Sequence, residues 1–263
     1  MLRIDGTDAV RYLNGQITQD AQLAIRNRDR AFATCVTDAK GKLQAFGSIF
    51  SWDGKSVFLE APLELREILL ARIERYLIAD EAEIVDVSDD YHLRHVLSLE
   101  GYQENPGGMV LRFDRLGVPG MDDWRPVAAP VKEDGISWDD AEKIRIRQGV
   151  PRWGAELEEG ILPPEAGLEA CAISYGKGCY IGQEVISRIK TVGKLNRTLA
   201  RFFLADETDQ SKNLVGAELL MGETVVGQIR SHAEGHAMGW IKKIAFEEAS
   251  FLTSCGVKLK RVK

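Results

Sequence analysis

The sequence lacks any hydrophobic run long enough to cross a membrane as a helix. None of its 263 residues belongs to a stretch of about 18 consecutive apolar residues, the length that a bilayer core requires. The opening residues, Met1 to Gly6, carry neither the apolar core of a secretory signal nor the arginine-rich composition of a transit peptide. These absences predict a cytoplasmic protein that does not associate with membranes.

Cysteine and histidine are scarce, at four residues each. No C-x-x-C pair occurs among the cysteines, which are Cys35, Cys171, Cys179 and Cys255. Neither a structural zinc site nor a disulfide framework is therefore indicated. His232 and His236 have a metal-ligand spacing only if they share a helix, and the intervening Gly235 disfavours a helix. We expect no bound metal.

Positive charge is in deficit, because 40 acidic residues outnumber 34 Lys and Arg residues and give a net charge of −6. Affinity for phosphates comes from clustered Lys and Arg, so we expect no direct contact with nucleic acid. Residues 156–169 carry only acidic charges, and residues 188–201 carry only basic ones. The acidic run fits a partner surface and the basic run an anion site, but each equally fits a solvated face.

Hydrophobic periodicity predicts an α+β body in the first three quarters of the chain. Capping side chains at 5–8 precede a short helix, and the tetrad Ser137 to Asp140 resembles a capping box for a helix that ends at Gly149. The segment 118–130 is rich in Pro and Gly and is expected to be irregular. The other predicted elements are strands at 31–37, 43–50, 56–60, 83–87, 92–99 and 110–113, and a helix at 62–78.

The pattern changes near residue 195, where only short strand-like runs follow. Met221, Gly222 and Glu223 form a hairpin turn between two of these runs. The predicted strands are 201–204, 218–221, 225–230, 237–241 and 257–262. We therefore divide the chain into an α+β body of residues 1–195 and a C-terminal β-barrel module of residues 196–263.

A glycine-rich segment, residues 172–189, is the strongest candidate for chemistry. Glycine lets a ligand approach the backbone closely. Neighbouring positive charge from Lys177 and Arg188 favours the reactive thiolate form of Cys179, although many free cysteines are simply buried small hydrophobes. No sequence pattern ties a histidine to this cysteine as a general base.

The run Lys177-Gly178-Cys179-Tyr180-Ile181-Gly182-Gln183-Glu184-Val185 resembles the signature of the YgfZ-type folate-binding proteins. These proteins are relatives of the aminomethyltransferase (T-protein) of the glycine cleavage system. The similarity also covers residues 6–20, 37–42, 145–154, 162–165 and 193–197, in the order of the family. It thus extends over nearly the whole chain.

The resemblance implies a fold like that of the T-protein and YgfZ, with three subdomains around a central folate cavity, the last of them a small β-barrel. It also implies binding of tetrahydrofolate or a derivative, and a role in the synthesis or maintenance of iron-sulfur enzymes, including those that modify tRNA. Iron-sulfur proteins or assembly factors are the implied partners. Functional importance is carried over to Cys179, with its surrounding site formed by Lys177, Gly178, Tyr180, Gly182, Gln183 and Glu184.

A folate combines a flat pterin with an anionic glutamate tail, so its site needs aromatic or apolar walls and a base for the carboxylate. We expect Trp153 and Tyr180 as candidate walls, and Arg188 or Arg197 as candidate bases. Ordinary core packing explains the aromatic residues at least as well, and a solvated face explains the arginines better than a ligand contact does.

Two departures from the aminomethyltransferases are visible. Arg147 stands where those enzymes hold the pteridine with a glutamate, and the segment 56–62 shows no counterpart of their catalytic Asn-Asp pair. A folate-dependent aminomethyl or one-carbon transferase is therefore the second hypothesis, and it requires an acid near the folate. The third hypothesis is a scaffold without a cofactor that recruits iron-sulfur partners through residues 156–169 or the β module.

Overall fold

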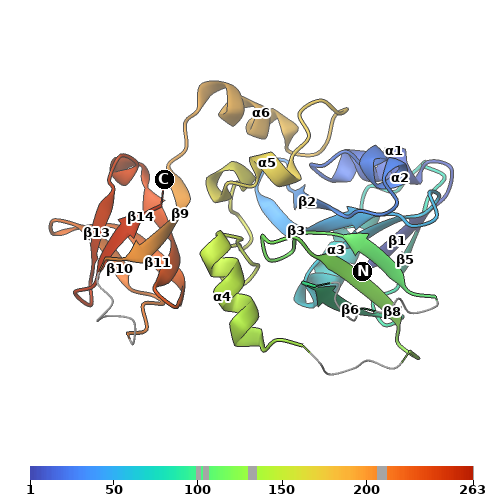
Figure 1. The fold of residues 1–263 in the computed structure, drawn as a ribbon. Helices are drawn as coiled ribbons and strands as arrows, with labels where there is room; N and C mark the ends of the chain where they lie inside the picture. Colours follow the sequence, from blue (N-terminus) through green and yellow to red (C-terminus); the bar gives the residue numbers. More distant parts are fainter. Residues whose placement is uncertain (99–101, 103–106, 130–134, 206–211, 263) are drawn as a thin grey trace.

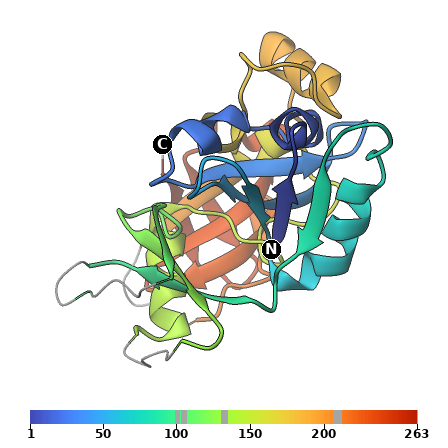
Figure 2. The same ribbon diagram turned by 90° about the vertical axis from the view of Figure 1, so that its right-hand side faces the viewer.

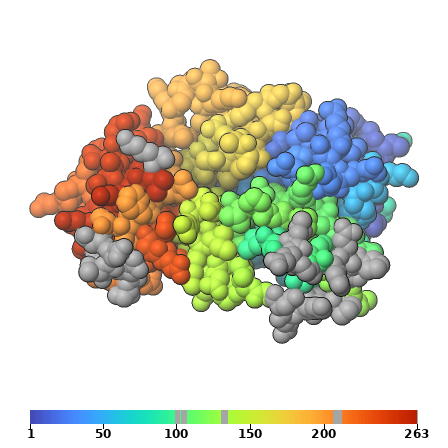
Figure 3. Space-filling model, in the orientation of Figure 1, coloured from blue at the N-terminus to red at the C-terminus, as the bar shows by residue number. Residues whose placement is uncertain are grey.

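The computed structural model describes residues 1–98, 102, 107–129, 135–205 and 212–262 (Figure 1). Two antiparallel sheets and their helices lie at one end of the molecule, and a β-barrel lies at the other. Helix α4 and the segment through α5 and α6 lie between the two ends, and the surface of α4 is visible between them in Figure 3.

The first sheet has five strands in the order β2-β3-β4-β1-β5. Two of the turns that join its strands place glycine at positive φ, Gly41 at 72° and Gly54 at 74°, which suits a residue without a side chain. The predicted meander is confirmed, and β1 is added to it. The strands are β1 (Leu2–Asp5), β2 (Phe32–Thr37), β3 (Leu43–Phe50), β4 (Val57–Glu60) and β5 (Glu83–Asp86).

One face of this sheet packs against the helices α1 (Ala9–Gln16), α2 (Gln22–Arg26) and α3 (Arg66–Glu74), the last preceded by the short 3₁₀ helix η1 (Leu63–Leu65). Side chains such as Ile4, Leu13 and Ile73 are fully buried there. The predicted helix at 62–78 is too long, because α3 ends at Glu74. Ile78, beyond the end of α3, is 89% exposed. The helical spacing of apolar residues in the sequence therefore extends past the last turn that packs against the core.

A second, three-stranded sheet has the order β6-β8-β7, with β6 (Tyr91–Val96), β7 (Met109–Arg112) and β8 (Met121–Pro126). The prediction that 118–130 is irregular is wrong, because β8 is the central strand. Its proline is the last residue and does not interrupt the ladder. Asp122 and Asp123 point to opposite faces of the sheet and are both buried. They hid the strand from the sequence analysis, because acids paired with arginines occupy positions where apolar residues are expected. Leu99, at the end of one predicted strand, lies outside the described residues.

Helix α4 (Trp138–Gln148) begins and ends where the sequence predicts. The hydroxyl of Ser137 accepts a hydrogen bond from the amide of Asp140 at 3.1 Å. At the other end Gly149 adopts φ 79°, a left-handed cap that glycine tolerates without strain. Both caps are therefore encoded locally, and the helix packs against the barrel strands β11 and β12.

The C-terminal strands close into a barrel in the order β10-β11-β12-β9-β14-β13, which confirms the predicted β-barrel and the α+β class. Gly222 and Glu223 join β10 to β11 as the predicted hairpin turn. The short β13 was missed. The division at 195/196 stays a prediction, and the first barrel strand begins at Arg197. The strands are β9 (Arg197–Leu204), β10 (Glu218–Met221), β11 (Thr224–Ala233), β12 (His236–Lys242), β13 (Ser250–Thr253) and β14 (Lys258–Arg261).

The glycine-rich segment is only partly a loop. It follows η2 (Pro163–Ala166) and α5 (Glu169–Ala172), and it leads into α6 (Gln183–Val192), a helix that the sequence analysis did not predict. Gly182 caps α6 with φ 88°. In Figure 2, α6 stands clear of the sheets, which leaves Ile186 as its buried residue.

Candidate functional site

The predicted site residues fall into two groups. Residues 177–184, which we call the motif loop, contact the end of α1 and the turn between β2 and β3. Trp153 and Arg197 instead lie beside the barrel. The structure therefore brings the motif residues together. Separately, Trp153 packs against the same apolar core as Trp240, the residue that Arg197 contacts.

Lys177 fastens the motif loop to α1. Its ammonium nitrogen donates to the carbonyl oxygens of Ile17 at 2.7 Å and Gln19 at 3.0 Å. It also donates to the backbone carbonyl and the side-chain oxygen of Asn14. The last carbonyls of a helix have no partner within it and carry partial negative charge, so a cation stabilises them. Burial nevertheless lowers the pKa of Lys177 to about 7, against a smaller opposing effect of Asp20.

The other end of the motif loop is also fixed. The carbonyl of Ile181 accepts a 2.6 Å hydrogen bond from the hydroxyl of Thr37, and its amide donates to the carbonyl of Gly15 at 3.2 Å. A Cβ atom on Gly182 would lie 2.5 Å from the carbonyl oxygen of Asp38. Only glycine fits that contact without a shift of the backbone.

Between these two anchors, Cys179 and its neighbour Gly178 are exposed. The alternative of a buried small hydrophobe is realised by a different cysteine, Cys35 on β2, where complete burial raises the thiol pKa strongly. The thiol of Cys179 thus stands on a fixed loop and is open to a reactant or a partner protein.

Tyr180 packs inward against Ile173 and Ile186 and is 7% exposed. Burial raises its pKa to about 12, and its hydroxyl has no hydrogen-bond partner in the described part of the chain. The Gln183 side chain accepts from the Tyr180 amide at 3.2 Å, which closes the turn before α6. Tyr180 and Gln183 are therefore positioned inside the loop rather than at its surface.

Glu184 and Arg188, one turn apart on α6, form an exposed ion pair in which 2.7 Å separates Oε1 of Glu184 from NH2 of Arg188. Such a pair on a helix surface contributes about 0.3–0.5 kcal/mol and keeps both side chains accessible to water. The acidic run at residues 156–169 does not form one exposed surface either. Glu156 is buried in an ion pair with Arg145, and Glu165 in an ion pair with Arg197. Neither charge run forms one continuous charged surface.

Trp153 belongs to a set of half-buried aromatic side chains that we call the junction cluster. They pack against one apolar core, which includes Leu157 and Ile161, and they come from β3, the end of β7, the loop after α4 and β12. The members of the junction cluster are Phe46, Phe113, Trp153 and Trp240. Body and barrel thus both contribute aromatic faces at their junction.

Charged side chains border the junction cluster. The guanidinium of Arg197 lies 4.7 Å from the ring centre of Trp240, and its Nε donates to the buried carboxylate of Glu165 at 3.0 Å. Arg115 lies 5.2 Å from the ring of Phe113 and pairs with Glu60 at 3.2 Å. A guanidinium group therefore lies over one ring face of Trp240 and another over one ring face of Phe113.

The sequence analysis names Trp153 and Arg197 as candidates, and it does not name the other three aromatic residues of the junction cluster. Phe46, Phe113 and Trp240 are far apart in the chain, and each has the pattern of an ordinary strand residue. No local motif marks them, because their common position depends on the closure of the barrel against the sheet. The one signal in the sequence was that each is a large aromatic residue within a predicted strand.

Among the described residues, no group of three His, Cys, Asp or Glu side chains is arranged to hold a metal ion. His232 and His236 lie on β11 and β12 rather than on a helix. None of the helices that the structure describes is both long and apolar enough to span a bilayer.

Replacing Lys177 with methionine is expected to change how stability depends on pH. The folded-state pKa is about 7 against an ordinary value of 10.5, so between these values the unfolded chain binds more protons than the folded chain. Relative to Lys177→Met, the wild-type free energy of unfolding should rise with pH across this window, by up to about 1.4 kcal/mol per unit. Urea denaturation at several pH values measures the difference. Lys190→Met, on exposed α6, is the control, and parallel profiles for Lys177→Met and wild type would contradict the prediction.

A scan against protein-family models gives no match. Among characterised sequences, the chain is 26% identical to the tRNA-modifying protein YgfZ of Vibrio atlanticus, over 89% of this chain and 78% of that one. It is also 26% identical to the YgfZ protein of Klebsiella pneumoniae, over 74% and 66%. A third relative, the mitochondrial iron-sulfur cluster assembly factor IBA57 homolog of Pyricularia oryzae, is 27% identical over 93% and 67%. The chain thus spans about two thirds to three quarters of the length of these proteins.

Among solved structures, the fold matches the glycine cleavage system aminomethyltransferase T of Bartonella henselae with a TM-score of 0.83. The match covers 100% of this chain and 82% of that one at 15% sequence identity. At that identity the likeness is one of fold. It extends across both sheets, the connecting helices and the barrel.

Proposed function

From the premise that this chain belongs to the YgfZ-type family, which is related to the aminomethyltransferase of the glycine cleavage system, we propose that it binds tetrahydrofolate or a derivative. In that state it assists the synthesis or maintenance of iron-sulfur enzymes, including enzymes that modify tRNA. The partners are iron-sulfur proteins or their assembly factors, and the place of action is the cytoplasm.

The junction cluster carries this proposal. A pterin is a flat ring whose faces need apolar or aromatic contacts, and half-buried Trp153 and Trp240 supply such faces from opposite sides of the body-barrel junction. A folate also ends in a carboxylate, for which a guanidinium is the best partner, and Arg197 lies against Trp240. The aromatic faces and the guanidinium of Arg197 are the features that support the proposed folate site.

In this proposal the motif loop serves a separate step. Cys179 is exposed on a loop that Lys177 and Gly182 fix in place, which suits a thiol that must meet a second protein. Gly178 and Glu184 lie on that surface, and Arg188 borders it through its pair with Glu184. Tyr180 and Gln183 support it from inside the loop. We propose that Cys179 faces the client protein, while the folate is held at the junction cluster.

Calorimetric titration with tetrahydrofolate and its 5-formyl and 5,10-methylene forms tests the proposal. We expect micromolar binding that survives Cys179→Ala and weakens about tenfold, or about 1.4 kcal/mol, in Trp240→Ala. Tyr76→Ala removes an exposed aromatic side chain that is not part of the junction cluster and should leave affinity unchanged. Absence of heat with every folate would overturn the proposal and favour the scaffold hypothesis.

The two other hypotheses have less support. A transferase needs an acid near the folate. At the position where the aminomethyltransferases hold the pteridine with a glutamate, this chain instead has Arg147, which is exposed on α4. A scaffold that uses residues 156–169 needs an accessible acidic surface, yet Glu156 and Glu165 are buried in ion pairs. The geometry therefore favours a protein that binds folate but does not catalyse a transfer reaction.

A further inference from the structure

A hollow of about 460 Å³ lies between helix α6 and the short helix α5. Most of its lining is apolar and accessible to water. Tyr175, Ile189 and Leu195 are half-buried there, and Ala170 on α5 is exposed. A hollow of this size is large enough to admit an apolar side chain of another molecule.

Helix α6 has an apolar stripe that the fold covers only in part. Its members recur at the spacing of one helix face and are Val185, Ile186, Ile189 and Val192. Ile186 is fully buried, whereas Val192, at the end of the stripe, is 55% exposed. Ile189 lines the hollow, so the uncovered part of the stripe adjoins it. The fold therefore leaves an apolar surface here that a second molecule would bury.

Lysines without an acidic partner stand at both ends of α6. At its C-terminal end, the amino group of Lys190 lies 3.5 Å from the ring centre of Tyr175. Lys194 is exposed directly after Gly193, which caps the helix. Among the described residues, neither lysine lies within 4.0 Å of a carboxylate oxygen. Both ammonium groups are therefore open to an anionic partner.

At the N-terminal end of α6, the β2–β3 turn adds two more lysines. A Cβ atom on Gly41 of this turn would lie 3.2 Å from the Cγ1 atom of Ile186, so the turn packs directly against the helix. Lys40 and Lys42, on either side of Gly41, are exposed. The carboxylate of Asp38 accepts hydrogen bonds from their backbone amides, at 2.8 and 2.9 Å, and leaves their ammonium groups unpaired in the part of the chain that the structure describes.

The other acids of this surface already have partners. Glu169 accepts a 2.5 Å hydrogen bond from the hydroxyl of Tyr175, and Glu184 pairs with Arg188 at 2.7 Å. With every charge counted, three acids face five cations, which are Lys40, Lys42, Arg188, Lys190 and Lys194. This surface is therefore positive in a chain of net charge −6, and it complements an acidic partner.

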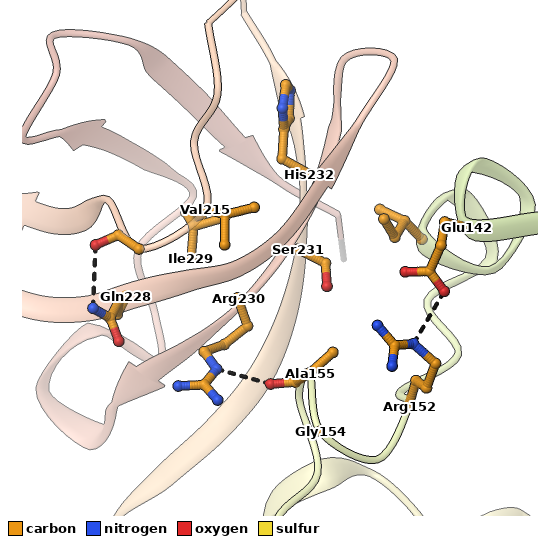
Figure 4. A pocket seen from close by; sticks show the side chains of 12 residues that line it. Glu142, Arg152, Gly154, Ala155, Val215, Gln228, Ile229, Arg230, Ser231 and His232 are labelled. Atoms are coloured by element: carbon orange, nitrogen blue, oxygen red, sulfur yellow. Dashed lines mark hydrogen bonds and ion pairs between the residues drawn. The ribbon is translucent and has the colours of Figure 1, made fainter. Parts of the chain in front are cut away.

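The groove between α4 and β11 differs in this respect (Figure 4). Its guanidinium groups are bound to the protein itself. Arg152 donates to Glu142 at 3.1 Å, and Arg230 donates to the carbonyl of Ala155 at 2.8 Å. These contacts hold parts of the chain together, so the hollow at α6 is the better candidate for a charged partner.

The hollow also adjoins the motif loop. Tyr175, which lines the hollow, packs against the small core formed by Tyr180 and Ile186. Tyr180 directly follows Cys179, whose side chain is exposed. A segment that is anchored in the hollow therefore passes close to the loop that carries the thiol.

We propose that the hollow and the lysines around it form the docking surface for an acidic segment of the client protein, which inserts one apolar side chain into the hollow. The inference rests on the proposed function, because it gives the chemistry of the partner that Cys179 meets. The apolar side chain would cover Ile189 and Val192, and the carboxylates would meet the free lysines. A nucleic acid fits less well, because Glu169 in the lining repels phosphate.

Fluorescence anisotropy tests this assignment with a labelled peptide that has one leucine between two runs of glutamate. At about 50 mM salt, we expect this peptide to bind about tenfold more tightly than the same peptide with serine in place of leucine, because the hollow buries the leucine. A peptide with lysines in place of the glutamates should bind at least about tenfold more weakly. Binding of the acidic peptide should weaken at about 500 mM salt, because charges are then screened.

Variants of the protein locate the peptide. Ala170→Phe fills the hollow from an exposed position on α5 and should weaken binding about tenfold. Lys190→Gln combined with Lys194→Gln should weaken it about threefold or more. The matched controls are Ala71→Phe, at an exposed position on α3, and Lys55→Gln, in the β3–β4 turn, and both should keep full affinity. None of these residues belongs to the junction cluster, so all variants should bind tetrahydrofolate as wild type does.

Several results would overturn the docking surface. They are no binding of the acidic peptide up to about 1 mM, equal binding of the serine or lysine peptide, and full affinity in Ala170→Phe. A single-stranded RNA oligonucleotide that binds more tightly and displaces the peptide would assign the surface to nucleic acid instead. A dimer in sedimentation that Ala170→Phe dissociates would assign it to a second copy of the chain.

The folate titration separates this inference from the proposed function. Folate binding without peptide binding would overturn the docking surface and leave the proposed folate site intact. Peptide binding without folate binding would overturn the folate site and support the docking surface alone, as the scaffold hypothesis requires.

Discussion

Replacing Arg145 with methionine should lower the free energy of unfolding by about 3–5 kcal/mol. Arg145 is 2% exposed and holds together the turn after α4 and the barrel. Its NH1 group donates to Glu156 at 3.0 Å, and its NH2 group donates to the hydroxyl of Ser231 on β11 at 3.0 Å. Methionine fills much of the volume but leaves the carboxylate of Glu156, which is fully buried, without its cation.

The size of this effect depends on burial, so a surface pair is the matched control. Arg188→Met breaks the exposed pair with Glu184 and should cost less than about 1 kcal/mol. Adding Glu156→Gln to Arg145→Met removes the unpaired charge and should recover part of the loss. Urea denaturation of the four proteins measures these differences. A loss in Arg145→Met no larger than in Arg188→Met would show that the buried pair adds little to stability.

The fold was predictable where its signals are local. The hairpins of the first sheet and the helix α4 follow from turn glycines and caps such as Gly41, Ser137 and Gly149, each of which acts within a few residues. Strand β8 was not predictable, because two of its buried positions, one on each face, hold Asp122 and Asp123. Their burial is compensated by Arg115 and Arg125, and such partners are visible only after folding.

The candidate site divides in the same way. The motif loop is contiguous in sequence and was found as a unit, including the tight glycine Gly182. The junction cluster unites Phe46 of the sheet with Trp240 of the barrel, which are almost 200 residues apart. Trp240 reaches the cluster only because the barrel closes and packs against the body. A sequence pattern records helix and strand periods, but it does not record which faces meet.

Gly182→Ala is expected to destabilise the protein by about 2–5 kcal/mol. Two costs add. The residue has φ 88°, where an alanine side chain costs about 1–2 kcal/mol. Its Cβ would also lie 2.5 Å from the carbonyl oxygen of Asp38 and 2.8 Å from the Cα of Gly41, and such overpacking costs about 1–3 kcal/mol. Both neighbours are backbone atoms of the β2–β3 turn, so they cannot rotate away.

Two glycines of the same region separate these costs. Gly193 has φ 66° with open space around its Cα, so Gly193→Ala should show the backbone cost alone, about 1–2 kcal/mol. Gly178 has neither a positive φ nor a close neighbour, so Gly178→Ala should stay within about 0.5 kcal/mol of wild type. Urea midpoints at constant slope give the three values.

The same series tests whether the motif loop must be fixed for Cys179 to act. If Gly182 holds the loop against the β2–β3 turn, Gly182→Ala should change the alkylation rate of Cys179, whereas Gly193→Ala should not. A Gly182→Ala variant as stable as Gly193→Ala, with an unchanged alkylation rate, would mean that the turn yields to the added methyl group. The glycine would then serve the start of α6 and not the presentation of the thiol.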